Sequence, residues 1–197
     1  MSITRIALAA ALSAILSVSL VAPAAAARVY NPDSNLWEES TTVAARSKRG
    51  SAIAKAIVDY ETTLKPGTIV VETSERRLYL VMDDGKALKY GIGVGRDGFR
   101  WQGQHKITRV AEWPGWTPPP AMRKRVPDLP AYMPGGPDNP LGARALYIGS
   151  TLYRIHGTSE PWTIGQAVSS GCIRLTNEDV TDLYERVKVG ALVVVRQ

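Results

Sequence analysis

Short apolar segments, several of them alternating with polar residues, recur from residue 68 to the end of the chain. β-branched residues and a period of two are typical of strands with one buried face. The pattern predicts a hairpin turn at residues 83–86 and strands over residues 68–71, 77–82, 87–94, 106–110, 145–148, 152–156 and 191–196. Short strands joined by glycine-rich turns predict a mostly β fold, either a sandwich or a barrel.

The pattern changes near the C-terminus, where one α-helix is predicted. Its apolar positions follow the i, i+3, i+4, i+7 spacing of a single helix face: Val180, Leu183, Tyr184 and Val187. Asn177 is the expected N-cap residue, acidic residues follow in the first turn, and Gly190 is expected to end the helix. Alanines and isoleucines that share a face in residues 51–60 favour a second, short helix.

A proline-rich segment separates the strands, since nine of the chain's 13 prolines lie between Pro114 and Pro140. Proline has no N–H to donate and a fixed φ, so no regular structure is expected through residues 118–120 or 134–137. A loop of this length in a compact domain is typical of a lid or binding loop. The alternative is an extended strap that covers a sheet edge.

Residues 1–27 are predicted to be a cleavable signal peptide. Arg5 is the only charged residue, an apolar run extends from residue 6 to 21, and the alanines at 24–27 are small enough for a signal peptidase. The alternative is an uncleaved membrane anchor, but the apolar run is shorter than the roughly 20 residues that span a bilayer, which favours cleavage. No stable membrane insertion is expected after cleavage. Residues 28–65 are predicted to be an N-terminal arm or linker, and residues 66–197 the folded domain. The expected location is the periplasm or cell envelope.

Composition and charge narrow the classes of protein. With 45% hydrophobic and 21% charged residues, the chain is neither low-complexity nor collagen-like. A single cysteine excludes an intramolecular disulfide framework and a zinc ribbon. The net charge of +6 suits anionic wall polymers or lipid surfaces in the envelope better than nucleic acid, although charge alone does not select a partner.

The single cysteine, Cys172, stands in the sequence Ser-Ser-Gly-Cys-Ile-Arg-Leu, residues 169–175. It is either a buried small hydrophobe or a reactive thiol, and a free thiol in an exported protein is open to oxidation. Gly171 lets the backbone approach a ligand, and consecutive N–H groups there could hold an oxyanion. Arg174 projects to the same strand face and could hold a carboxylate or favour the thiolate.

His156 ends a predicted strand, sixteen residues before Cys172. A cysteine and a histidine are the minimum for thiol catalysis, because the imidazole takes the thiol proton and returns it to the leaving amine. No carboxylate adjoins His156 in sequence, so a backbone carbonyl near Gly157 is expected to orient the ring. His105 is predicted to be an ordinary surface or strand-edge histidine. A zinc site built from Cys172 and both histidines matches no compact ligand pattern, so no metal or cofactor is expected.

Two motifs resemble the signature of the YkuD-type L,D-transpeptidases of the bacterial cell wall: His-Gly-Thr at 156–158 and Ser-Ser-Gly-Cys-Ile-Arg-Leu at 169–175. The resemblance extends from about residue 67 to 196. It includes Gly-Ile-Gly-Val-Gly at 91–95, Asn-Pro-Leu-Gly at 139–142 and the strand that leads into His156. It implies a YkuD-like β-sandwich with a short C-terminal helix, a long proline-rich loop, and Cys172 at the rim of a cleft.

The resemblance also implies a reaction on peptidoglycan tetrapeptide stems. Cys172 would attack the carbonyl of the third residue, expel the terminal D-alanine, and pass the acyl group to an amine. That amine would belong to a second stem, which gives a 3–3 cross-link, or to a lysine of an envelope protein. His156 would be the base, and Gly171, Cys172 and Gly157 would supply backbone groups. The side chains expected to position the substrate are Arg174, Ser169, Ser170 and Tyr153. The family implies sensitivity to carbapenems, and a monomer is the default expectation.

One position departs from the family pattern, because many members have a second histidine where this chain has Ser170. Serine donates a hydrogen bond but carries no charge near neutral pH. The assignment of the base to His156 becomes simpler, while the contribution of the missing imidazole is left open. Two alternative functions are an L,D-carboxypeptidase or thiol amidase, in which water takes the acyl group, and a wall-binding module with an idle cysteine.

Overall fold

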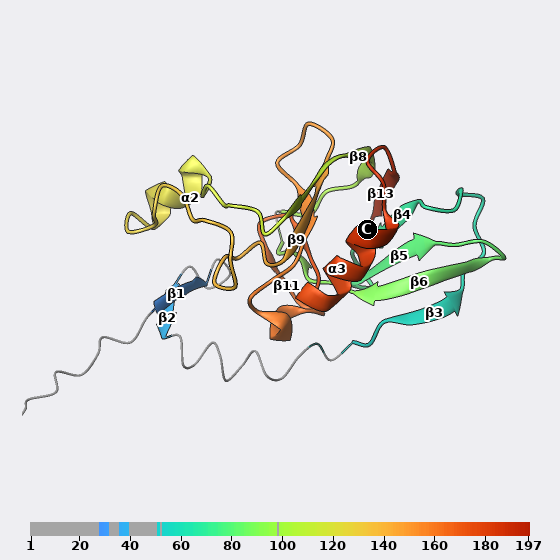
Figure 1. The fold of residues 1–197 in the computed structure, drawn as a ribbon, viewed down its shortest axis with the longest axis horizontal. Helices are drawn as coiled ribbons and strands as arrows, with labels where there is room; N and C mark the ends of the chain where they lie inside the picture. Colours follow the sequence, from blue (N-terminus) through green and yellow to red (C-terminus); the bar gives the residue numbers. More distant parts are fainter. Residues whose placement is uncertain (1–27, 32–35, 40–50, 52, 98) are drawn as a thin grey trace, which may run out of the picture.

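The computed structural model describes residues 28–31, 36–39, 51, 53–97 and 99–197 (Figure 1). The predicted signal peptide lies outside the described residues. Within these ranges, no helix is long and apolar enough to cross a membrane. The strands are β1 (Arg28–Asn31), β2 (Leu36–Glu39), β3 (Ala56–Asp59), β4 (Ile69–Glu72), β5 (Arg77–Val81), β6 (Lys86–Gly91), β7 (Val94–Gly95), β8 (Gly103–Glu112), β9 (Arg144–Ile148), β10 (Arg154–His156), β11 (Ala167–Ser169), β12 (Ile173–Arg174) and β13 (Leu192–Arg196). The helices are α2 (Pro120–Arg125), the 3₁₀-helix η1 (Pro161–Thr163) and α3 (Asn177–Arg186).

Nine strands form a sheet in the order β12-β10-β9-β8-β13-β4-β5-β6-β3. The long strand β8 belongs to two layers, because residues 103–106 pair with β13 and residues 107–112 pair with β9. The register shifts between Ile107 and Arg109, where the strand passes from one layer to the other. The sheet folds over on itself at this point. The predicted mostly β sandwich is therefore confirmed.

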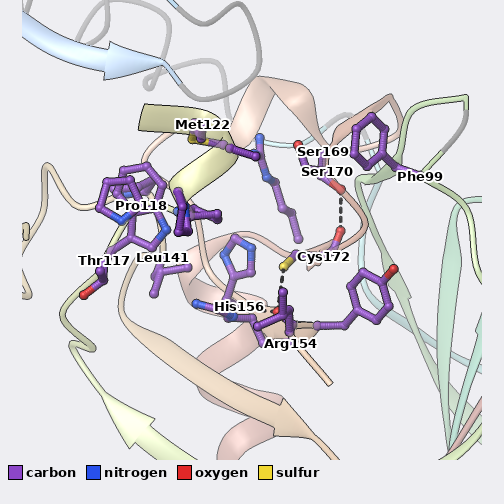
Figure 2. Close-up of a pocket in the computed structure, with 18 of the residues that line it drawn as sticks. Phe99, Thr117, Pro118, Met122, Leu141, Arg154, His156, Ser169, Ser170 and Cys172 are labelled. Atoms are coloured by element: carbon purple, nitrogen blue, oxygen red, sulfur yellow. Dashed lines mark hydrogen bonds between the residues drawn. The ribbon is translucent and has the colours of Figure 1, made fainter. Parts of the chain in front are cut away.

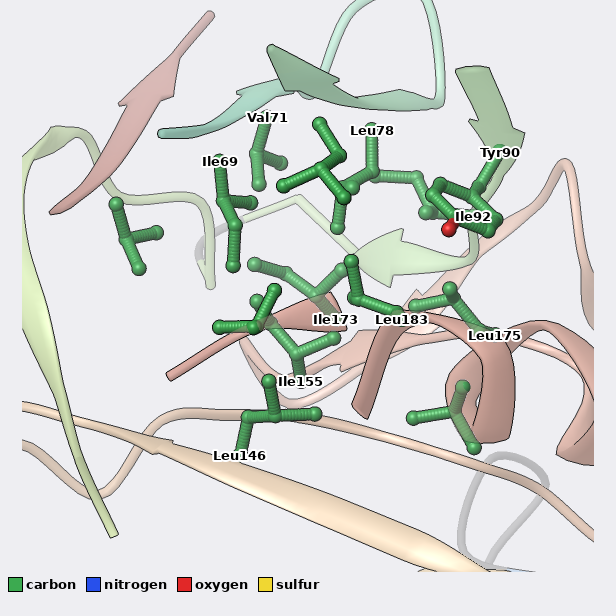
Figure 3. Close-up of a cluster of buried hydrophobic side chains, with 14 of the residues drawn as sticks. Ile69, Val71, Leu78, Tyr90, Ile92, Leu146, Ile155, Ile173, Leu175 and Leu183 are labelled. Carbon is green, nitrogen blue, oxygen red and sulfur yellow. The ribbon is translucent and has the colours of Figure 1, made fainter. Parts of the chain in front are cut away.

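The hydrophobic core lies between the two layers (Figure 3). Ile69, Val71 and Leu78 come from β4 and β5, whereas Leu146 and Ile155 come from β9 and β10 on the opposite side. All five side chains are fully buried. Burial of each such side chain contributes roughly 1.5–3 kcal/mol, so contacts between the layers are a main source of stability.

The helix predicted over residues 51–60 is wrong, because part of this segment forms β3. The strand pairs antiparallel with β6 at the edge of the sheet, with Ile57 opposite Leu88 and Val58 opposite Ala87. β-branched residues fit a pleated edge, and the free edge of β6 supplies the hydrogen-bond partners. Tertiary pairing therefore overrides the weak helical spacing of the alanines and isoleucines. The segment predicted as an arm contributes the outermost strand of one layer.

Helix α3 confirms the predicted C-terminal helix but not its ends. The N-cap residue is Thr176, whose hydroxyl accepts a hydrogen bond from the N–H of Asp179 at 3.0 Å. Asn177, the predicted cap, is the first helical residue, and its side-chain oxygen accepts from the N–H of Ala143 at 2.9 Å. The helix ends before Gly190, which has a φ of +95° in the turn that leads to β13.

In the proline-rich segment, no helix or strand runs through residues 118–120 or 134–137, as predicted, and the short helix α2 begins only at Pro120. Proline is compatible with the first helical position, where the missing N–H would have no partner within the helix. A second, small core holds the segment together: Trp116, Met122, Leu129 and Leu141. Trp116 and Met133 also exchange two backbone hydrogen bonds of 2.8 Å. The segment is a folded loop with its own core.

Candidate active site

A cavity of about 610 Å³ lies between the proline-rich segment and the turn that carries Cys172 (Figure 2). One wall is mainly apolar and includes Met122 and Leu141. The other wall carries His156, Ser170 and Cys172. Of the two interpretations of the proline-rich segment, this arrangement supports a binding loop.

Cys172 lies in the turn between β11 and β12, and three hydrogen bonds fix this turn. The Ser169 hydroxyl donates to the Cys172 carbonyl at 2.6 Å and accepts from the Gly171 N–H at 3.2 Å. The indole N–H of Trp101 donates to the Gly171 carbonyl at 2.8 Å. The N–H of Cys172 has no hydrogen-bond partner among the described residues. Of the two N–H groups predicted to hold an oxyanion, the one at Cys172 is therefore available, and buried Ser169 holds the turn.

Gly171 takes a backbone conformation that few other residues could adopt. Its φ is +103°, and a Cβ atom at this position would run into the ring of Tyr153 and lie 3.2 Å from the Phe99 carbonyl oxygen. Tyr153 stacks on Trp101 with ring centroids 4.6 Å apart. Tyr153, predicted to position substrate, lines the cavity and also packs against the turn at Gly171.

The thiol and the imidazole line the same cavity from neighbouring strands. Cys172 is half-buried, with its Sγ 4.0 Å from the carbonyl oxygen of Leu152. His156 ends β10, which pairs in parallel with β12, the strand that begins directly after Cys172. Figure 2 shows both side chains at the cavity, and the hydrogen bond of the thiol goes to the Leu152 carbonyl. The structure thus brings together the two residues predicted to react.

A backbone carbonyl fixes the tautomer of His156. Its Nδ1 lies 2.6 Å from the carbonyl oxygen of Gly157. A carbonyl can only accept, so Nδ1 carries the hydrogen and Nε2 has the free lone pair. The predicted orientation by a carbonyl near Gly157 is confirmed. The N–H of Gly157 itself donates to the Arg144 carbonyl at 3.0 Å, so Gly157 contributes its carbonyl to the site and its N–H to the sheet.

Burial keeps the imidazole uncharged. It lowers the pKa of His156 to about 3, and the positive charges of Arg174 and Arg154 act in the same direction. The hydrogen bond to Gly157 opposes this shift but is outweighed. At neutral pH His156 is therefore uncharged, with Nε2 unprotonated.

Because His156 is buried uncharged, the free energy of unfolding should fall as the pH drops below 6.5. The unfolded chain binds a proton at the ordinary pKa of 6.5, while the folded chain resists protonation down to about 3. Unfolding then takes up a proton, which costs the folded state about 1.4 kcal/mol per pH unit. Urea denaturation at pH 7.5 and 5.5 should show wild type losing about 1.4 kcal/mol more than His156→Gln. Equal losses in the two proteins would contradict an uncharged buried ring.

Arg174 is more buried than expected for a side chain predicted to hold a carboxylate of the substrate. Its side chain is buried and lines the cavity, and its guanidinium lies 3.8 Å from the carboxylate of Glu160, which is also buried. The carboxylate that faces Arg174 in this structure thus belongs to the chain itself. Ser170 is half-buried at the cavity wall, as expected of a residue near the substrate.

Sequence reasoning missed three side chains that shape the site: Trp101, Glu160 and Arg125. Trp101 reaches Gly171 across 70 residues, and Arg125 enters from α2. Such contacts leave no local pattern in a sequence. Across the described ranges, no group of three or more His, Cys, Asp or Glu side chains could hold a metal ion.

The sequence profile of YkuD, described as the L,D-transpeptidase catalytic domain, matches residues 66–195. The chain belongs to this family. The matched YkuD domain contains every residue that lines the cavity, including His156 and Cys172. The family assignment and the candidate site therefore refer to the same part of the molecule.

Individual relatives agree with the YkuD assignment. The Escherichia coli protein ErfK/SrfK, a probable L,D-transpeptidase, is 45% identical over 139 residues, which cover 66% of this chain and 44% of that protein. The chain thus covers less than half the length of this curated relative.

Two solved structures show the same fold. A Brucella melitensis protein, named a probable carnitine operon oxidoreductase, is 44% identical with a TM-score of 0.52, covering 77% of this chain and 98% of that one. L,D-transpeptidase 3 from Mycobacterium tuberculosis, in complex with a faropenem-derived adduct, is 19% identical with a TM-score of 0.52, covering 66% and 60%. These names describe different activities, and the structural likeness assigns neither of them to this chain.

Proposed function

We propose that the chain is an exported cysteine L,D-transpeptidase that acts on peptidoglycan tetrapeptide stems in the periplasm or cell envelope. The observation that carries this proposal is the placement of Cys172 and His156 in one cavity, with the Nε2 lone pair of His156 free to accept a proton. Membership of the YkuD family supports the reaction class. Loss of residues 1–27, whose only charged residue is Arg5, lowers the net charge from +6 to +5, which still suits an anionic polymer as the surroundings of the substrate.

In the first half-reaction, the Cys172 sulfur attacks the carbonyl carbon of the third stem residue while His156 Nε2 takes the thiol proton. The carbonyl oxygen becomes an oxyanion, to which the N–H of Cys172 donates a hydrogen bond. Collapse of this intermediate breaks the amide bond to the terminal D-alanine. The proton on His156 passes to the leaving amine, and a thioester joins the stem to Cys172.

In the second half-reaction, an amine replaces the thiol. The amine attacks the thioester carbonyl and gives a proton to His156, and the carbon–sulfur bond then breaks. An amide bond has formed, and the proton returns to the sulfur. The acceptor amine comes from a second stem, which gives a 3–3 cross-link, or from a lysine of an envelope protein, which is then anchored to the wall.

The products of a disaccharide–tetrapeptide should identify the reaction. We expect mature wild-type protein to form a dimer that has lost one D-alanine, because one stem acylates Cys172 and a second supplies the amine. Mass spectrometry of the products measures this, and a Cys172→Ala sample run in parallel should contain none of the dimer. A reaction with an added lysine-containing peptide tests the alternative acceptor in the same way.

Two other results would change the assignment. Tripeptide alone, with either acceptor present, would show that water takes the acyl group and that the protein is an L,D-carboxypeptidase. Unchanged substrate in every reaction, together with retained binding to isolated peptidoglycan, would contradict catalysis and indicate a wall-binding module.

A further inference from the structure

The cavity that contains Cys172 carries an excess of positive charge. Three guanidinium groups line it, from Arg125 on α2, Arg154 on β10 and Arg174 on β12. Among the described residues that line the cavity, none is an aspartate or a glutamate. A cavity with this lining favours an anionic ligand, because guanidinium groups bind carboxylates through charge-assisted and often bidentate hydrogen bonds.

The three arginines are not equivalent. Arg174 faces the buried carboxylate of Glu160, which offsets its charge. Arg154 is partly buried, and its guanidinium donates to the backbone carbonyl of Leu152 at 3.1 Å. Arg125 is exposed, and among the described residues no carboxylate lies within 4.0 Å of its guanidinium. Arg125 is therefore the guanidinium best able to meet a carboxylate that arrives with a ligand.

The fold of the proline-rich segment gives Arg125 a defined position. Met122 precedes it by three residues, so the two side chains share one face of α2. Met122 is buried in the small core with Trp116 and Leu141, and Met122 and Arg125 both line the cavity. Arg123 lies on the same helix but does not line the cavity. The small core thus holds one particular cation of α2 at the cavity wall, opposite the turn that carries Cys172.

We propose that Arg125 is a specificity-determining residue that recognises a free carboxylate of the acyl-donor stem. This inference rests on the proposed function, since a tetrapeptide stem has carboxylates besides that of the terminal D-alanine. They are the α-carboxylate of the second residue and the side-chain carboxylate of a diaminopimelate third residue. Amidation of either removes the negative charge with almost no change in shape. A free-acid stem then gains an interaction with Arg125 that its amide lacks.

Three synthetic donor stems test this proposal: the free acid, the amide of the second-residue carboxylate, and the amide of the third-residue side chain. Wild type should prefer the free acid over one of the two amides by about tenfold in kcat/KM, the lower range for a hydrogen bond between charged groups. Arg125→Gln should reduce this preference to less than about twofold by slowing the free acid alone. Arg123→Gln, the matched control on the same helix, should keep the wild-type preference. The amide with the lower kcat/KM in wild type identifies the carboxylate that Arg125 binds.

A binding measurement separates this inference from the proposed reaction. Calorimetry with Cys172→Ala compares the dissociation constants of the three stems without turnover, and the same measurement follows in Cys172→Ala/Arg125→Gln. Loss of the free-acid preference in the double variant supports the role of Arg125, even if wild type forms no product. An equal preference in both variants, or no preference in either, would overturn it. Failure of wild type to release D-alanine from any stem would instead contradict the proposed function.

Discussion

Replacing Cys172 with alanine should lower turnover of the tetrapeptide by more than about 10⁴-fold, because the acyl–enzyme can no longer form. The chain has one cysteine, so any thioester or thiol adduct reports on this residue alone. A carbapenem should add its mass once to wild type and not to the variant, as measured by intact-protein mass spectrometry. The side chain is only half-buried at a cavity wall, so the variant should retain its fold and its melting temperature within a few degrees.

Two results would contradict this expectation. Loss of the folded state in Cys172→Ala, followed by circular dichroism, would mean that the residue is needed as a buried hydrophobe. A carbapenem adduct on the folded variant would place the acylated group elsewhere in the chain. The first result would restore the interpretation of Cys172 as a buried hydrophobe, and the second would remove the thiol from the proposed mechanism.

Replacing His156 with glutamine should lower kcat by about 10²- to 10⁴-fold, the usual contribution of a general base. The glutamine amide can still donate a hydrogen bond near the Gly157 carbonyl, but it has no nitrogen lone pair that accepts the thiol proton. The KM should change much less, since the ring supplies proton transfer more than binding contacts. Steady-state release of D-alanine measures both constants.

His105→Gln is the matched control, because His105 is the chain's other histidine. Its ring packs edge-on against Trp101 at 5.6 Å and does not line the cavity. We expect kcat to stay within a few-fold of wild type. Equal losses of kcat in the two histidine variants would contradict a special role for His156.

The sequence predicted most strands because a strand with one buried face alternates apolar and polar residues, and this pattern is visible locally. It could not predict which strands pair, since pairing depends on distant partners. The segment 87–94 illustrates this point, as its apolar run predicts one strand. The structure divides it between β6, which ends at Gly91, and β7, which begins at Val94 and pairs with β11 beside the turn that carries Cys172. The edge strand β3 was missed because β6 supplies its partner groups.

The proposed pair of Cys172 and His156 was predictable because the chain has one cysteine and two histidines, and because both motifs are local. The surroundings of the pair were not. Arg174 on a strand near a thiol indicates a carboxylate site, and only the fold brings Glu160 beside it. Arg125 is one of several basic residues in its segment, and the burial of Met122 decides that it reaches the cavity.

Strand β13 has a consequence for how the protein acquires its structure. It holds the last strand residues of the chain yet lies inside the sheet, where it pairs with β4 and with β8. The Thr73 hydroxyl bonds to the Arg196 carbonyl across 123 residues. Folds rich in such distant contacts form slowly, on a scale of roughly milliseconds to seconds, because loop closure must precede the gain from packing. Residues 192–196 must therefore reach the middle of the sheet before β4 is joined to β8, and we expect this long-range pairing to limit the rate of folding.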